Sequence, residues 1–231
     1  MEREGSEPDR AVRDRIPLFP LGTVLYPGLL LPLHIFEERY RRLVRDLAER
    51  PPEEQLFGVV AIRQGREVGA DGVKALHEVG CAAQVRRIQE YEDGRFDLAT
   101  TGGPRFQLVG VDHSLPYLQG VVEWLPEGPG EAAEVLAGPV GRRFLAYRSA
   151  LVGEAVDDAA GQIPDDPRVL SYLVAAAMIL DLPDHQALLA AGDDTERLTL
   201  ALRLLRREGS LLRLLPSVPG VDYTRIPLSP N

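Results

Sequence analysis

Apolar residues recur at two different spacings along the chain, and the spacing changes near residue 125. Between residues 56 and 125 the period is two, as in the alternating run Val79, Cys81, Ala83 and Val85. A period of two is typical of a β-strand with one buried face. Beyond residue 125 the apolar residues follow 3.6 residues per turn, which indicates helices. The pattern therefore predicts a group of short strands followed by a group of helices.

One amphipathic helix is predicted ahead of these strands. Its apolar residues all fall on one face at 3.6 residues per turn, and they are Phe36, Tyr40, Leu43, Val44 and Leu47. We therefore expect all five to face the core. A short strand at residues 15–19 precedes this helix. Because proline cannot donate to a β-ladder, Pro17 and Pro20 predict that the strand lies at a sheet edge or at a strand end.

Capping signals divide the second half of the chain into helices. Asp166, followed by proline, is typical of an N-cap. Asp193 with Glu196 three residues later resembles a capping box, and it predicts a helix that runs to Gly209. Acidic residues gather at these helix starts, where they complement the helix dipole. Residues 138–139, a Gly-Pro pair, predict a kink or a restart in the first helix.

These elements predict an α+β fold, with a small barrel or curled sheet and one early helix, followed by a small helical bundle. A Pro- and Gly-rich stretch after residue 125 marks the boundary. The predicted units are a strand subdomain at 13–125 and a helical subdomain at 131–215. Residues 1–12 are polar and are predicted to be disordered. Residues 216–231 contain four prolines and are predicted to form an extended tail.

The charge and composition narrow the class of protein. The net charge is −9, and no long segment carries the basic excess that attracts nucleic-acid phosphates. No run approaches the roughly 18 apolar residues of a membrane-spanning helix. The N-terminus is acidic and does not resemble a secretory signal, and one cysteine excludes an internal disulfide. We expect a cytoplasmic protein that binds neither membrane nor, on this charge, nucleic acid.

Lys74 is the only lysine of the chain, so it tests two catalytic motifs at once. A phosphate-binding P-loop needs glycine before its lysine and serine or threonine after it, whereas Lys74 lies between Val73 and Ala75. A Ser–Lys protease dyad would also have to use Lys74, which falls in a predicted loop or strand. No Gly-x-Ser-x-Gly elbow is present. We predict that the chain is not an enzyme.

The candidate metal ligands fall short of a complete site. His34 with Glu37 and Glu38 could converge near the start of the early helix, but these side chains are predicted to cap or solvate its first turn. His77 and Cys81 share one face of a strand, yet two ligands do not close a tetrahedral site, and Cys81 is predicted to be a core residue. The acidic pairs are those at residues 157–158, 165–166 and 193–194, and they are predicted to cap helices. We predict no metal and no cofactor.

The apolar run Leu29, Leu30 and Leu31 has two interpretations. It could be an exposed surface on which a peptide docks, or it could be a buried strand, as most contiguous apolar runs are. Together with His34, these three leucines are the candidate peptide-binding residues.

The opening of the chain resembles the N-terminal domain of the Lon protease family. The resemblance covers about residues 13–215, and its specific part is Ile16-Pro17-Leu18-Phe19-Pro20-Leu21, Leu25-Tyr26-Pro27-Gly28 and Leu31-Pro32-Leu33-His34-Ile35-Phe36-Glu37-Glu38-Arg39-Tyr40. It implies a PUA-like β-barrel followed by a helical bundle. It also implies recognition of substrate polypeptide. In Lon proteases the ATPase and protease activities belong to separate modules, and we expect this chain to lack both.

The resemblance and the missing motifs together predict a non-catalytic polypeptide-binding or adaptor module that stands alone. Its partners would be unfolded or client polypeptides, which it could present to a separate protease in protein quality control. Two alternatives stay open, because a fold does not fix a function. One is RNA binding by a PUA-like protein, which the acidic balance disfavours, and the other is a small-molecule site. The oligomeric state stays open.

Overall fold

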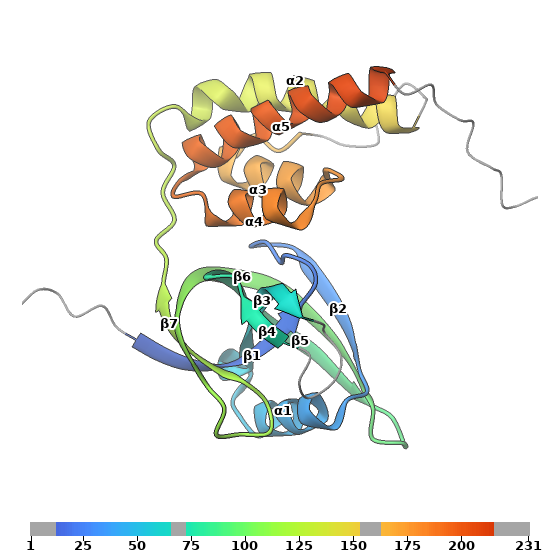
Figure 1. The fold of residues 1–231 in the computed structure, drawn as a ribbon, viewed down its shortest axis with the longest axis vertical. Coiled ribbons are helices and arrows are strands. Elements are labelled where there is room, and N and C mark those ends of the chain that lie inside the picture. Colours follow the sequence, from blue (N-terminus) through green and yellow to red (C-terminus); the bar gives the residue numbers. More distant parts are fainter. Residues whose placement is uncertain (1–12, 66–72, 153–162, 215–231) are drawn as a thin grey trace, which may run out of the picture.

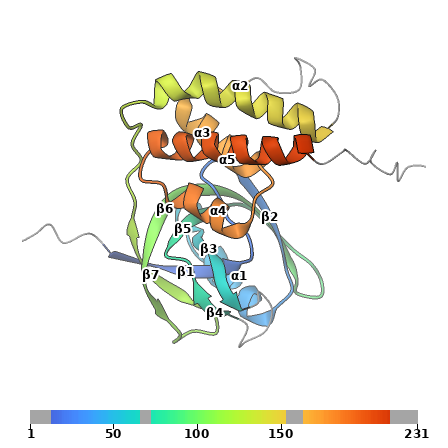
Figure 2. The same ribbon diagram turned by 45° about the horizontal axis from the view of Figure 1, so that its top comes forward.

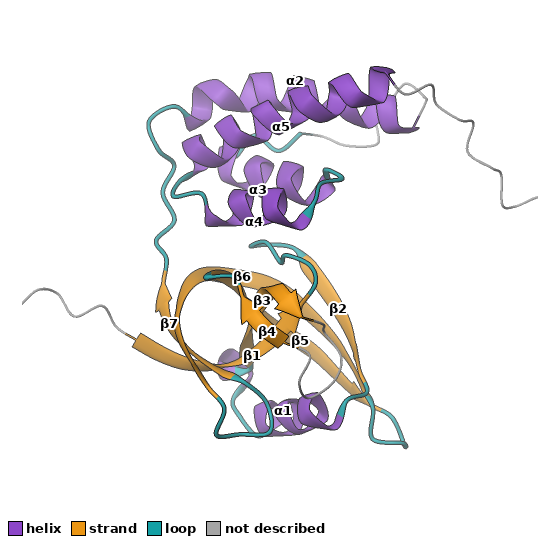
Figure 3. Cartoon of the chain, viewed as in Figure 1, coloured by secondary structure: helices purple, strands orange, loops and turns teal. Residues whose placement is uncertain are grey.

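The computed structural model describes residues 13–65, 73–152 and 163–214. The expectations for residues 1–12, 157–158 and 216–231 lie outside the described residues. Strands come first and helices follow, as the change of period predicts (Figure 3). The elements are β1 (Arg13–Leu21), β2 (Leu30–Ile35), α1 (Glu38–Ala48), a 3-10 turn (Pro52–Glu54), β3 (Leu56–Gly65), β4 (Val73–Leu76), β5 (Val79–Glu90), β6 (Phe96–Asp112), β7 (Gln119–Trp124), α2 (Ala133–Val152), α3 (Pro167–Ala177), α4 (Leu182–Ala190) and α5 (Asp194–Leu214).

Five strands pair in a closed ring, in the order β1, β7, β6, β5, β3 and back to β1. We call these strands the strand ring. The pairings are antiparallel except for β1 with β3. β2 adds to the outside of this path by pairing with the first half of β6, and β4 extends the ring from β3. The helices α2–α5 form a layer over one end of the ring, while α1 lies at the opposite end (Figure 1). We call α2–α5 the helix layer.

The strand that contains Pro17 and Pro20 is longer than the predicted strand at residues 15–19 and belongs to the strand ring. β1 runs from Arg13 through Pro17 and Pro20 to Leu21 and has partners along its whole length. It changes partner after Pro17, because residues 13–17 pair with β7 and residues 18–21 pair with β3. Each half therefore has one paired side. A proline is tolerated where its missing N–H would point to the other side.

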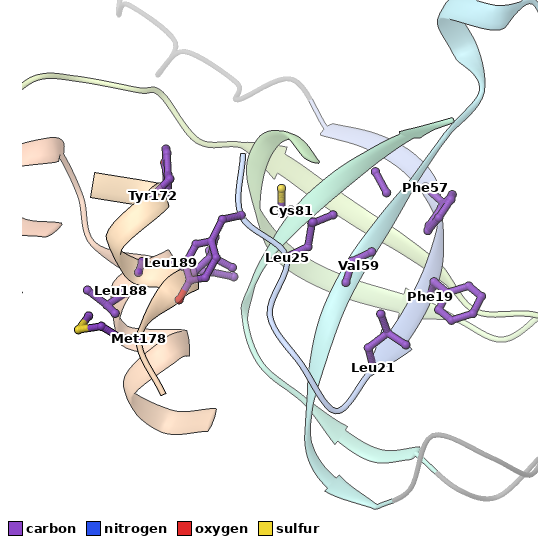
Figure 4. Packing of buried hydrophobic residues seen from close by; sticks show 14 of the residues in the cluster. Phe19, Leu21, Leu25, Phe57, Val59, Cys81, Tyr172, Met178, Leu188 and Leu189 are labelled. Carbon is purple, nitrogen blue, oxygen red and sulfur yellow. The ribbon is translucent and has the colours of Figure 1, made fainter. Parts of the chain in front are cut away.

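The main hydrophobic core continues from the strand ring into the helix layer. Figure 4 shows buried side chains from both parts of this one cluster, among them Leu25 and Cys81 on the ring side and Leu188 and Leu189 of α4. Cys81 is fully buried, and this burial raises the pKa of its thiol to about 12. The thiol is therefore neutral at physiological pH, and the prediction that it is a core residue is confirmed.

The early helix buries the face that its spacing predicts, with one exception. Tyr40, Leu43, Val44 and Leu47 are buried on α1. Phe36 is 53% exposed and lies before the helix, which begins at Glu38. The expectation that Phe36 faces the core is therefore wrong, because the chain is still extended at that position and its side chains alternate rather than spiral.

The predicted caps of the later helices are confirmed. Asp166 accepts backbone N–H groups from the first turn of α3. Asp193 accepts the N–H of Glu196 at 2.8 Å, and Glu196 in return accepts the N–H of Gly192 at 2.6 Å. One boundary differs from expectation, because α5 runs past Gly209 to Leu214. Of the kink or restart predicted at residues 138–139, the restart does not occur, because α2 continues through Pro139.

One buried arginine, Arg105, joins the strand ring to the helix layer. Arg105 of β6 donates to the carbonyl oxygens of Leu189 and Ala191 at 2.7 and 2.6 Å. Its Nε lies 2.6 Å from Glu127, which also accepts the Tyr172 hydroxyl. These groups come from β6, from the connection to α2, and from the helix layer. A charge-assisted network of this kind fixes the orientation of one unit on the other.

Arg197 of α5 repeats the arrangement inside the helix layer. It donates to the Leu188 carbonyl at 3.1 Å and to Asp194 at 2.8 Å, and its guanidinium lies 4.1 Å from the centre of the Tyr172 ring. Burial lowers the pKa of Arg197 below its ordinary value. That value is so high that the guanidinium keeps its charge, which the acidic and carbonyl partners compensate.

Candidate functional site

One face of β2 exposes apolar side chains where a surface strand would ordinarily carry polar ones. Leu30, Pro32, His34 and Phe36 are exposed, and the residues between them are buried or half-buried. We call these four residues the β2 stripe. Leu30 is 78% exposed and Phe36 is 53% exposed. Because alternate residues of a strand point to the same side, the stripe is a continuous row on the outside of the sheet.

The residues beneath the stripe hold β2 in place. Leu29, Leu31 and Leu33 are partly buried and pack against the main core, and Ile35 is fully buried. The structure thus divides the candidate peptide-binding residues into two groups. Leu30 and His34 face outward, whereas Leu29 and Leu31 face inward. The leucine run is therefore neither wholly exposed nor wholly buried, because a period of two places its members on opposite faces.

β2 is an edge strand whose free side is interrupted by proline. Among the described strands it pairs only with β6. The Gly102 N–H donates to the Leu29 carbonyl at 2.7 Å. In an antiparallel ladder, alternate residues direct their backbone groups to the same neighbour, so Pro32 directs its own groups away from β6. Pro32 has no N–H to donate to a further strand. A ligand at this edge would therefore be held by side chains more than by strand pairing.

A polar cluster beside the stripe orients His34. His34 Nδ1 lies 2.7 Å from Asp97 Oδ1, and the Tyr91 hydroxyl donates to the same carboxylate. The hydrogen bonds from Tyr91 and then from His34 hold the pKa of Asp97 below its ordinary value. The His34 ring lies 6.5 Å from the ring of Phe36 and 6.3 Å from that of Tyr91. Three exposed rings therefore gather at one end of the stripe.

A small cavity opens beside these rings, between the ends of β1 and β2 and the start of α1. Its volume is about 190 Å³, and its lining is Phe19, Pro20, Leu21, Leu33, His34, Ile35, Phe36, Glu37 and Tyr40. Sites for small organic ligands are larger, at roughly 300–1,000 Å³. The cavity is therefore large enough for a single apolar side chain and smaller than a typical site for an organic ligand.

The other candidate ligands of the sequence are engaged elsewhere. Glu37 occupies the N-cap position of α1 without a capping hydrogen bond from its side chain, and it pairs with Arg39 at 3.1 Å. Glu38 pairs with Arg41 and Arg45. Within residues 13–65, 73–152 and 163–214, no group of three or more His, Cys, Asp or Glu side chains comes together. None of the described helices is long and apolar enough to span a bilayer.

Sequence reasoning missed Pro32, Phe36 and Tyr91 as parts of this surface. A signal for two of them was present, because Leu30, Pro32, His34 and Phe36 follow a period of two. The helical spacing from Phe36 to Leu47 hid it, since Phe36 fits both patterns. Tyr91 had no such signal, because only the pairing of β2 with β6 brings it close to His34.

A protein-family model covers most of the chain. Residues 15–207 match the family model of the ATP-dependent protease La (LON) substrate-binding domain. Among curated proteins, Lon protease 2 of Myxococcus xanthus is 27% identical over 204 residues, covering 86% of this chain and 24% of that protein. Lon protease of Escherichia coli is 26% identical over 212 residues, covering 90% of this chain and 26% of that protein. The chain spans about a quarter of the length of these relatives.

Two solved structures share the fold. The N-terminal domain of a Mycobacterium avium complex Lon protease has a TM-score of 0.64 at 18% identity, covering 85% of this chain and 98% of that one. A Lon N-terminal domain protein from Xanthomonas campestris has a TM-score of 0.56 at 23% identity, covering 88% and 99%. At these identities the likeness concerns the fold alone.

Proposed function

The chain belongs to the Lon substrate-binding domain family, and from that premise we propose that it is a non-catalytic module that binds polypeptide through the β2 stripe. The observation that carries the proposal is the row of exposed apolar side chains on an edge strand. Unfolded polypeptides expose the apolar side chains that folded ones bury, and burying them against Leu30 and Phe36 removes apolar surface of both partners from water.

The dimensions of the stripe fit a short extended segment. The Cα atoms of Leu30 and Phe36 are separated by six residues, or about 20 Å at the rise of a β-strand. An extended client segment of similar length can follow the whole stripe and insert one apolar side chain into the cavity beside Phe36 and Tyr40. The protein would then select client segments by their content of apolar side chains rather than by a defined sequence.

The resemblance to this family also suggests the type of barrel, the subdomains and the partners, and we include them in the proposal. The strand ring would be a PUA-like β-barrel, and residues 13–125 and 131–215 would be two subdomains. Leu29 and Leu31 would support the stripe from beneath, while Leu30 and His34 contact the client. The partners would be unfolded client polypeptides, and a separate protease would receive them in protein quality control.

A double substitution on the stripe tests the proposal. The variant Leu30→Ser with Phe36→Ser should weaken binding of a fluorescently labelled, permanently denatured protein by at least about tenfold. Burial of one large apolar side chain contributes roughly 1.5–3 kcal/mol, and 1.4 kcal/mol corresponds to a factor of ten. Fluorescence anisotropy at fixed ionic strength measures the affinity.

Val135→Ser is the matched control. Val135 is 76% exposed, similar to Leu30, but it lies on α2 in the helix layer. Its substitution should leave the affinity unchanged, and the melting midpoints of all variants should stay close to that of the unmodified protein. Equal affinity of the double variant and the unmodified protein would refute the assignment of the stripe. If the protein binds RNA with an affinity that falls as the salt concentration rises, and does not bind the denatured protein, polypeptide binding itself is refuted.

A further inference from the structure

A second recess lies where two strands separate at the edge of the strand ring. The His77 N–H donates to the Ala61 carbonyl of β3, whereas the Glu78 carbonyl accepts from Leu108 of β6. The chain thus changes partner between His77 and Glu78. Before this point β4 follows β3, and beyond Leu108 the strand β6 follows β7, so β4 and the end of β6 diverge (Figure 2).

Both diverging strands have an open side. Among the described strands, β4 pairs only with β3, and the end of β6 beyond Leu108 pairs only with β7. An open strand edge offers backbone N–H and carbonyl groups that can hold an extended chain. The space between β4 and β6 is therefore flanked by backbone that lacks a strand partner.

A cavity of about 430 Å³ fills this space, and we call it the fork cavity. Its lining is Arg39, Arg63, Ala75, Leu76, His77, Glu78, Leu108, Val109, Gly110, Val111, His113 and Leu118. Leu76, Leu108 and Leu118 pack against the smaller hydrophobic cluster around Phe106 and give the cavity an apolar floor. The volume falls within the range of ligand-binding sites.

The polar part of the lining contains both signs of charge. Arg39 and Arg63 are cationic, His77 and His113 can donate hydrogen bonds, and Glu78 is the one acidic side chain that lines the cavity. Arg39 is held by Glu37 at 3.1 Å and by the ring of Tyr40 at 4.5 Å. Because Arg39 is already paired, Arg63 is the arginine of the lining that is exposed to a bound anion.

We propose that the fork cavity binds the C-terminal end of a polypeptide whose last residues are apolar. The apolar floor receives the side chains, the open edges of β4 and β6 receive the backbone, and Arg63 receives the carboxylate. Each of these three features matches one part of such a terminus, and a free carboxylate is the only charge that every C-terminus carries. The proposal rests on the proposed polypeptide function but uses a site separate from the β2 stripe.

The removal of the carboxylate charge tests this site without altering the protein. A labelled ten-residue peptide ending in Leu-Val-Leu should bind at least about tenfold more tightly with a free C-terminal carboxylate than as the C-terminal amide. Arg63→Gln should reduce that ratio to about one. Arg63 is exposed and therefore tolerant of the change. Arg206→Gln, the same charge change on an exposed residue of α5, should leave the ratio intact.

The outcomes separate this inference from the proposed function. The double variant Leu30→Ser with Phe36→Ser should retain the carboxylate-to-amide ratio, even where it loses affinity for the denatured protein. Equal affinity of the carboxylate and amide peptides would overturn the inference, as would an unchanged ratio in Arg63→Gln. Competition by octanoate as strong as that of the peptide would identify a small carboxylate ligand and would likewise overturn the assignment to polypeptide.

Discussion

Arg105→Ala should lower the free energy of unfolding by about 3 kcal/mol, more than a typical substitution of a charged residue. Arg105 is 1% exposed and donates to two carbonyl oxygens of the helix layer, while its Nε lies against Glu127. The substitution leaves these acceptors without their donor. It also leaves the Glu127 carboxylate, 22% exposed, without its cationic partner. An unmatched charge next to the core is costly to keep dehydrated.

A matched arginine gives the control for this prediction. Arg168 pairs with Asp194 at 3.2 Å, but its side chain is 41% exposed. Arg168→Ala should therefore cost no more than about 1 kcal/mol, as exposed ion pairs do. Urea unfolding followed by circular dichroism measures both variants. If Arg105→Ala proves as mild as Arg168→Ala, the buried network does not hold the helix layer on the strand ring.

Leu43→Ala should destabilise the protein by about 2–5 kcal/mol, whereas Phe36→Ala should cost about 0.5 kcal/mol or less. Leu43 is completely buried on α1, so its truncation leaves a cavity in the main core. Phe36 is larger and equally apolar, but more than half of its surface is exposed. Urea unfolding of the two variants separates core packing from surface binding.

The same two variants should behave in the opposite way toward polypeptide. Phe36→Ala removes a ring of the β2 stripe and should weaken binding of a denatured protein. Leu43→Ala should leave that binding intact at temperatures where the variant is folded. A large loss of stability in Phe36→Ala would place Phe36 in the core and would remove it from the proposed surface.

Much of the fold follows from local patterns in the sequence. The change from period two to period 3.6 separates the strands from the later helices, and Asp166 and Asp193 lie at helix starts as predicted. These features were predictable because each depends on residues within one or two turns. The limits of β1 were not, because whether Pro17 ends a strand depends on which neighbour faces its missing N–H.

The candidate surface was only half predictable for a related reason. The leucine run identified β2, but burial of alternate residues depends on which side of the strand meets the core. Arg105 was not predictable at all, since its acceptors at residues 189 and 191 lie more than 80 positions along the chain. Contacts at such sequence separation leave no trace in spacing or composition.

The most direct measurement of the central claim is site-specific photo-crosslinking to a denatured client protein. A photoreactive phenylalanine derivative is placed in turn at positions 30, 36, 135 and 179, all of which hold exposed apolar residues. Positions 30 and 36 on the β2 stripe should crosslink to the client, and positions 135 and 179 in and beside the helix layer should not. Crosslinking from 135 or 179 with no product from 30 and 36 would contradict the account.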